Sequence, residues 1–235
     1  MSGRAAPGAR GVDAVPAAGD RRRYPAPAGL VFFHGPMDCG KSTLALQIDH
    51  NQARQGRCGL LLVRNDRSGP ARISSRLGMS RTAIEITDGL DLVELVRSRW
   101  AAGARVDYLV VDEAQFLGPA QVEALVDLVD DSHVDVYAFG ITTDFRGRLF
   151  PGSQRLLELA DSVEQLQVEV LCLCGRPGRL NARVVGGRVA RDGDTVLVAD
   201  TAAEAPVHYQ VLCRAHHRAG DLGPGARAPG QLTLG

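Results

Sequence analysis

The sequence predicts an α/β fold: a mostly parallel sheet with helices on both faces, followed by a small C-terminal module. Two observations predict it. Short, almost continuously apolar runs alternate with longer segments of helical periodicity, which is typical of parallel strands buried on both faces. Paired cysteines then follow this alternation near the end of the chain. With 235 residues, of which 45% are hydrophobic, the chain can bury one sizeable core and a small appended module.

The expected elements follow one another from residue 29 onward. Strands are expected at 29–35 (GLVFFHG), 58–64 (CGLLLVR), 107–113 (DYLVVDE) and 134–141 (VDVYAFGI). Helices are expected at 41–55, 87–103 and 118–132. Gly56 is expected to stop the first helix, and Pro119 stands near the start of the third. In such a sheet ligands bind beyond the carboxyl ends of the strands, so the site is expected in the loops that follow them.

The two ends of the chain differ in composition from the rest. Residues 1–28 are rich in Ala, Gly, Pro and Arg and contain no apolar run of the kind found in a secretory signal. A transit peptide is the alternative, but serine is scarce and Asp13 and Asp20 are acidic. We expect residues 1–28 and 219–235 to be disordered tails.

Charge and hydropathy argue against several classes of protein. Lys and Arg number 27 and Asp and Glu also 27, so the chain lacks the basic footprint of non-specific nucleic-acid binding. No apolar run approaches the roughly 18–20 residues that a membrane span requires. Five cysteines without an export signal point to metal binding or free thiols instead of disulfides. We therefore expect a cytoplasmic protein that binds neither nucleic acid nor membranes.

The stretch GPMDCGKST follows the first expected strand and precedes the first expected helix, which is the context of a phosphate-binding P-loop. Its backbone N–H groups and the helix N-terminus would surround phosphate oxygens, and Ser42 would hold Mg²⁺. Lys41 is the only lysine in the sequence. A compact ammonium on a slender side chain can reach the terminal phosphates, whereas a planar guanidinium reaches them poorly. A glycine-rich turn with a chance lysine is the alternative. The expected nucleotide-binding residues are Gly35, Pro36, Met37, Asp38, Cys39, Gly40, Lys41, Ser42 and Thr43. The fold class is thus a P-loop NTPase-like sheet.

The stretch LVVDEAQF supplies two carboxylates at the end of the third strand. Asp112 is assigned to Mg²⁺, which it would bind through water. Adjacent strand residues face opposite ways, so Glu113 is assigned a different task, accepting a proton from the attacking hydroxyl. Two roles compete for Glu113: base for a substrate alcohol in a kinase, or orienter of water in an ATPase. Gln115 of the same stretch is assigned to the nucleotide site.

Three stretches in this order and spacing, GPMDCGKST, DEAQF and TDFRGRLFPGS, resemble thymidine kinases of the type II class. The resemblance covers residues 29–218, including the cysteine-bearing part. It implies an ATP-dependent enzyme, usually tetrameric, with a P-loop domain (29–168) and a small zinc-containing lasso domain (169–218). It implies transfer of the ATP γ-phosphate to the 5′-hydroxyl of thymidine or deoxyuridine, with Glu113 as the general base.

The resemblance also implies a nucleoside pocket. Its expected residues are Met37, which would line the pocket for the thymine methyl, and Asp66, Arg67, Phe116, Phe145, Phe150, Val198 and Tyr209. Aromatic and apolar surface suits a flat, uncharged base, although each Phe could equally be ordinary core. Mobile solvated charges are the alternative for Asp66 and Arg67. Val198 begins Val-Ala-Asp where the family commonly has glycines in its lasso. Arg146 and Arg148 are candidates for phosphate contacts, with plain surface charge as the alternative.

The stretches LCLCG and YQVLCRAHH supply a two-plus-two ligand set suited to tetrahedral zinc. The expected ligands are Cys172, Cys174, Cys213 and His216. A C-x-C pair in a straight strand would hold its sulfurs too far apart, so the chain must turn there, which Gly175 would ease. Free buried thiols are the alternative, and His217 could replace His216. Cys39 and Cys58 have no partner in this pattern.

Two other functions compete with a nucleoside kinase. The Asp-Glu-Ala-Gln stretch also resembles the acidic motif of ATPases and helicases, which would make the protein an ATP-driven switch. Such machines usually need a second lobe or a partner arginine, and this chain has neither the length nor, for a helicase, the charge. The other competitor is a zinc-stapled interaction module without turnover.

Overall fold

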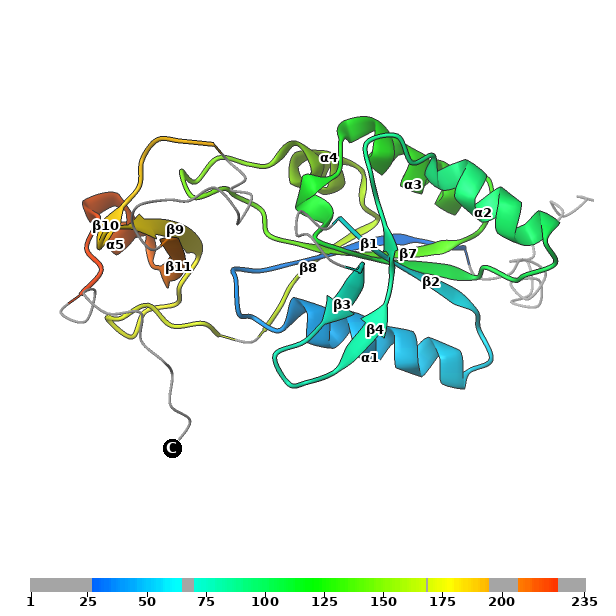
Figure 1. Cartoon of the computed structure of the whole chain (residues 1–235), viewed down its shortest axis with the longest axis horizontal. Coiled ribbons are helices and arrows are strands. Elements are labelled where there is room, and N and C mark those ends of the chain that lie inside the picture. The colour runs from blue at the N-terminus through cyan, green and yellow to red at the C-terminus, as the bar shows by residue number, and fades with distance from the viewer. Residues whose placement is uncertain (1–26, 65–69, 168, 195–206, 224–235) are drawn as a thin grey trace, which may run out of the picture.

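The structure is a computed structural model that describes residues 27–64, 70–167, 169–194 and 207–223 (Figure 1). Asp66, Arg67 and Val198, which were expected in the nucleoside pocket, lie outside the described residues. Most of each expected tail lies outside them as well.

A six-stranded sheet with the order β5-β2-β6-β7-β1-β8 forms the centre of the molecule. Every pairing within it is parallel, which confirms the predicted sheet. Its strands are β1 (Leu30–His34), β2 (Gly59–Val63), β5 (Ile84–Glu85), β6 (Tyr108–Asp112), β7 (Asp135–Gly140) and β8 (Ser162–Gln165).

Helices cover both faces of the sheet, as predicted (Figure 1). Helix α1 (Lys41–Arg54) lies on one face, and α2 (Leu92–Ala101), α3 (Pro119–Asp130) and α4 (Pro151–Leu159) lie on the other. Strand β6 shows why both faces need covering: successive strand residues point to opposite faces, and in β6 both sets are apolar. Leu109 and Val111 join the core beneath α2, α3 and α4, whereas Tyr108 and Val110 join the core beneath α1.

Local capping explains where the predicted helices begin and end. Gly56 adopts a left-handed φ of 77° just after α1, so the predicted stop is confirmed. The second helix is shorter than the predicted 87–103. It begins at Leu92 because the carboxylate of Asp91 accepts a hydrogen bond from the Glu94 backbone N–H at 2.9 Å and caps the first turn.

Several short elements are not revealed by the sequence pattern. These are the hairpin of β3 (Arg72–Ser74) and β4 (Ser80–Thr82), together with β5, α4 and β8. Strand β4 is exposed along its whole length, and α4 has only 9 residues, so neither presents a long apolar periodicity.

A second lobe follows the parallel sheet along the chain and lies beside it in space (Figure 1). It contains the antiparallel sheet β10-β9-β11 and helix α5 (Arg214–Ala219). The strands are β9 (Leu180–Val185), β10 (Arg188–Val189) and β11 (Val207–Leu212). Its buried core consists of Cys172, Ala182, Val184, Leu212, Cys213 and Leu222. Because this core is small and includes two cysteines, a metal staple would add much to its stability.

Within the described residues, no helix combines the length and the apolar character needed to cross a bilayer.

Candidate active site

The P-loop connects β1 to α1 at the end of the sheet that faces the second lobe. Gly40, which directly precedes α1, adopts a left-handed φ of 84°. Lys41 begins the helix, and its Nζ donates to the carbonyl oxygens of Pro36 at 2.7 Å and Gly35 at 3.2 Å. The ammonium therefore lies inside the curl of the loop, where phosphate oxygens would be surrounded by backbone N–H groups.

The floor of the loop is tightly packed. Cys39 is fully buried, and a Cβ atom on Gly35 would lie 2.5 Å from its Sγ, so a larger residue at position 35 would have to displace the Cys39 side chain. Asp38 has a positive φ of 68° and forms an ion pair with Arg76 of the β3–β4 hairpin at 2.6 Å. His34, at the end of β1, is half-buried, and burial together with the charge of Lys41 lowers its pKa. An imidazole held neutral in this way adds no charge beside the loop.

Ser42 and Asp112 meet beside the loop. The Ser42 hydroxyl donates to Oδ2 of Asp112 at 2.7 Å. Asp112 ends β6 and is only 4% exposed; burial, and then the neighbouring charge of Glu113, raises its pKa to about 6. The pair offers hard oxygen ligands of the kind Mg²⁺ prefers, and these residues fit the ion assigned to them.

Glu113 leaves the strand in a left-handed conformation, with φ 55° and ψ 35°. Such a backbone costs about 1 kcal/mol or more for a residue with a side chain, so its surroundings must hold it there. Gln115 provides one restraint: its Nε2 donates to Oε2 of Glu113 at 2.6 Å. The Oε1 atom of Gln115 accepts from the Ile141 backbone N–H at 3.2 Å. The buried amide therefore ties the carboxylate of Glu113 to the end of β7.

Two glycines that sequence reasoning missed confine the turn after Glu113. This turn is the 3-10 helix η1 (Ala114–Phe116). A Cβ on Gly140 would lie 2.8 Å from Oε1 of Gln115, and a Cβ on Gly152 would lie 2.6 to 2.9 Å from three carbonyl oxygens of the η1 region. For Gly152 the sequence offered only the Pro-Gly dipeptide of the stretch FPGS, which indicates a turn; its role in packing depends on helix α4, which the sequence pattern does not reveal.

Of the three expected phenylalanines, Phe116 ends this turn and Phe150 packs against it, whereas Phe145 lies in a separate loop; Phe145 and Phe150 are buried. Phe116 and Phe150 form an edge-to-face pair with ring centroids 5.4 Å apart. Phe145 is 2% exposed, and the guanidinium of Arg183 from the second lobe lies 3.8 Å from its ring centroid. Tyr209 of β11 is more exposed, and its hydroxyl accepts from Nε of Arg183 at 3.3 Å.

The loop that carries Phe145 is organised by Asp144, a residue that sequence reasoning did not single out. Oδ1 of Asp144 accepts from the backbone N–H groups of Arg146 and Arg148, both at 2.9 Å. Oδ2 pairs with Nε of Arg146 at 3.2 Å. Of the two arginines considered for phosphate contacts, Arg146 is thus held within its own loop, and Arg148 is exposed.

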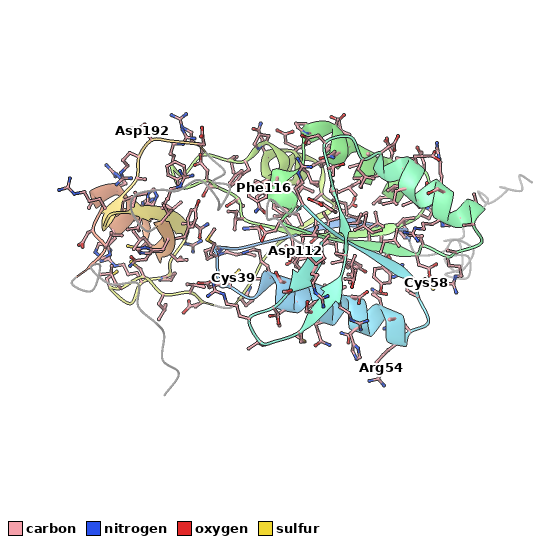
Figure 2. The ribbon with its side chains drawn as sticks, viewed as in Figure 1. Cys39, Arg54, Cys58, Asp112, Phe116 and Asp192 are labelled. Atoms are coloured by element: carbon pink, nitrogen blue, oxygen red, sulfur yellow. The ribbon has the colours of Figure 1, made fainter. Side chains whose placement is uncertain are left out.

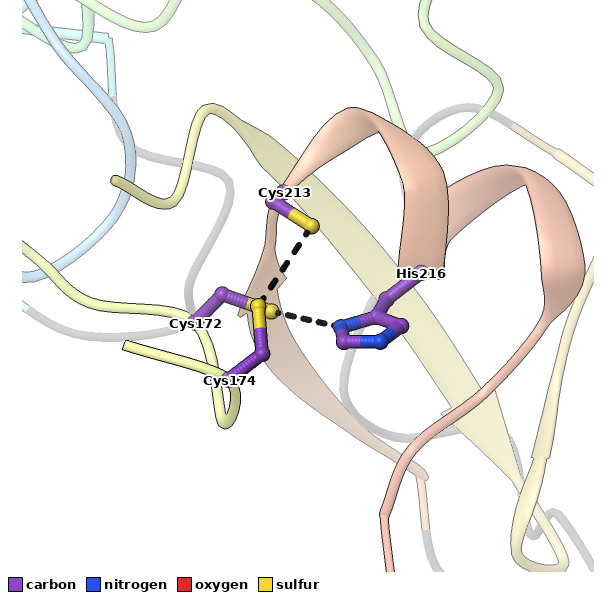
Figure 3. Close-up of side chains that lie close together, drawn as sticks. All are labelled: Cys172, Cys174, Cys213 and His216. Atoms are coloured by element: carbon purple, nitrogen blue, oxygen red, sulfur yellow. Dashed lines mark hydrogen bonds between the residues drawn. The ribbon is translucent and has the colours of Figure 1, made fainter. Parts of the chain in front are cut away.

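The structure brings together the four expected zinc ligands in the second lobe (Figure 3). The ligand atoms of Cys172, Cys174, Cys213 and His216 all lie within 4.8 Å of one another. The predicted turn after the C-x-C pair is present: Gly175 has φ 77°, and its N–H donates to the Cys172 carbonyl at 2.8 Å. His217 points elsewhere, with Nε2 bonded to the Phe145 carbonyl at 2.8 Å. Three sulfurs and one imidazole nitrogen form a donor set that suits Zn²⁺.

Residues of the P-loop and of the DEAQF stretch thus gather at one end of the sheet, where Figure 2 places Cys39, Asp112 and Phe116. A family model for thymidine kinase matches residues 28–217, which include this end of the sheet and all four cysteine and histidine ligands. The chain belongs to the thymidine kinase family.

Several relatives bear the thymidine kinase name. The chain is 57% identical over 191 residues to the thymidine kinase of Streptomyces coelicolor, covering 80% of this chain and 88% of that protein. It is 54% identical over 201 residues to that of Cutibacterium acnes, covering 86% and 93%. It is 39% identical over 203 residues to that of Ruegeria pomeroyi, covering 85% and 98%. The resemblance inferred from three short stretches to the thymidine kinase family is therefore confirmed.

Proposed function

We propose that this member of the thymidine kinase family transfers the γ-phosphate of ATP to the 5′-hydroxyl of thymidine, and also of deoxyuridine, in deoxynucleotide salvage. The observation that carries the proposal is the arrangement of Lys41, the Ser42–Asp112 pair and Glu113 at one end of the sheet, in a chain that matches this family over most of its length.

The chemistry requires one proton transfer and one displacement at phosphorus. Glu113 accepts the proton of the 5′-hydroxyl while that oxygen bonds to the γ-phosphorus. The bond from the γ-phosphorus to the bridging oxygen breaks, and ADP leaves with the electron pair. Lys41 offsets negative charge on the phosphates, and the loop N–H groups orient them. Mg²⁺, when bound by Ser42 and Asp112, would neutralise further charge on the phosphate oxygens.

The proposed nucleoside pocket uses residues from both parts of the chain. It consists of Met37, Phe116, Phe145, Phe150 and Tyr209, with Asp66, Arg67 and Val198 assigned by resemblance alone. We propose the same domain division as the resemblance implies, 29–168 and 169–218. We also propose, from the family resemblance, that the protein is a cytoplasmic homotetramer.

The decisive test of function is the choice of phosphate acceptor. With ATP labelled at the γ-phosphate, we expect label to pass to thymidine, and ATP consumption without nucleoside to be slow. Chromatography of the labelled products measures both. Rapid ATP hydrolysis that does not depend on nucleoside would favour an ATP-driven switch, and the absence of any turnover would favour an interaction module.

We also propose that the four-residue cluster binds one structural Zn²⁺. Removing a ligand through Cys213→Ser should release the metal and unfold the second lobe, because so small a core depends on the staple. Metal content and thermal unfolding measure the two effects. Cys58→Ser is the matched control, since Cys58 is exposed and lies outside the cluster. Full zinc content and unchanged unfolding in Cys213→Ser would contradict the assignment.

A further inference from the structure

The second lobe reaches the P-loop through a hydrogen bond at a residue with no assigned function. Oδ1 of Asn181 accepts from the backbone N–H of Met37 at 2.9 Å, although the two residues are 144 positions apart in the chain. Asn181 is 3% exposed. Because the acceptor is buried and the bond is partly shielded from water, its loss would cost free energy, so this bond constrains the conformation of the loop at Met37.

Asn181 is built into the same small sheet as the expected metal ligands. It lies on β9 opposite Val211 of β11, and the next pair along is Leu180 with Leu212. Cys213 follows directly, and α5 then carries His216. The position of Asn181 therefore depends on the framework that the metal cluster holds together.

Two more contacts tie this lobe to the loop that carries Phe145. His217, next to the ligand His216, bonds to the Phe145 carbonyl at 2.8 Å. Arg183, two residues after Asn181, places its guanidinium 3.8 Å from the Phe145 ring centroid. The lobe thus contacts both the P-loop and a loop assigned to the nucleoside pocket.

We infer that Asn181 is a positioning residue for phosphoryl transfer: by accepting from the Met37 N–H, it lets the metal-binding lobe order the P-loop and set the Met37 side chain against the nucleoside. The inference rests on the proposed function. Within the residues that the structure describes, the side chain of Asn181 reaches the P-loop through the Met37 N–H. Its loss should therefore affect thymidine binding and the mobility of the loop more than the transfer step itself.

The test compares two substitutions at the same position. Asn181→Leu keeps the size of the side chain but removes the acceptor, and we expect the thymidine KM to rise about tenfold, the effect of losing one partly buried hydrogen bond. Amide hydrogen exchange of the peptide spanning residues 35–43 should become faster. Asn181→Asp keeps an acceptor oxygen in place, so the thymidine KM and the exchange rate of this peptide should return towards those of the wild type. All KM values are taken at saturating ATP, because the carboxylate of Asn181→Asp would repel the ATP phosphates.

The matched control is Asn51→Leu, the same substitution at an exposed position on α1, which should change neither value. Wild-type KM and exchange in Asn181→Leu would overturn the inference while leaving the proposed function intact. Equal defects in Asn181→Leu and Asn181→Asp would also overturn it.

If the wild type does not phosphorylate thymidine, the proposed function fails. The hydrogen-exchange experiment needs no turnover, so it still decides whether the contact between Asn181 and Met37 orders the loop. Should Asn181→Leu fail to fold, Asn181→Ala replaces it.

Discussion

We expect Glu113→Gln to lower kcat for thymidine phosphorylation by about 10²–10⁴-fold, the usual contribution of a positioned general base. The amide cannot take up the proton of the 5′-hydroxyl, but it has the size of the carboxylate and can still accept the hydrogen bond that Gln115 donates at 2.6 Å. The KM for each substrate should therefore change little, because the missing interaction belongs to the transfer step. Steady-state kinetics with thymidine and ATP measure these parameters.

Glu94→Gln is the matched control for this substitution. Glu94 lies in the first turn of α2 and is exposed, so its loss should leave kcat unchanged. If Glu113→Gln kept appreciable kcat with thymidine, the carboxylate would not be the base. If the substitution instead abolished only ATP hydrolysis by water, Glu113 would be the orienter of water that an ATPase requires.

We expect Lys41→Arg to lower kcat/KM for ATP by about 10²–10³-fold, the size of effect seen when one preorganised charge-stabilising donor is lost. The Lys41 ammonium lies 2.7 Å from the Pro36 carbonyl, inside a loop whose floor is closed by Cys39. A planar guanidinium is too broad to take that place without opening the loop. Initial rates at varied ATP concentrations measure the change.

The opposite substitution, from arginine to lysine, provides the control. Arg54→Lys, in the last turn of the same helix, changes an exposed basic residue and should leave ATP consumption unchanged. Lys41→Arg with wild-type ATP binding and turnover would remove the basis of the enzyme assignment. It would also leave the presence of a single lysine in an arginine-rich chain without an explanation.

The central fold could be predicted because its signals are local. Strands such as β6 are apolar throughout, and the P-loop and the C-x-C turn are contained in a few consecutive residues. The turn at Gly175 could even be argued from geometry, since two sulfurs cannot otherwise reach one ion. Helix α4 and strand β8 escaped prediction because their boundaries depend on packing against distant parts of the sheet, and their own periodicity is short.

The supports of the site could not be predicted, because each joins residues far apart in the sequence. The Gln115–Ile141 bond spans 26 positions and the Asn181–Met37 bond spans 144. Sequence also cannot separate a ligand-binding aromatic from a core one. Phe145 is nearly buried and is held by Arg183, a partner that no local pattern reveals.

The place of β1 in the sheet determines when the P-loop can form during protein synthesis. Although β1 is the first of the described strands to leave the ribosome, Leu30 pairs with Val136 and Val31 with Ser162. A nascent chain therefore carries the whole GPMDCGKST stretch long before the strands on either side of β1 exist. Until they emerge, β1 has two unpaired edges, so early folding must shield an apolar strand that other chains could capture.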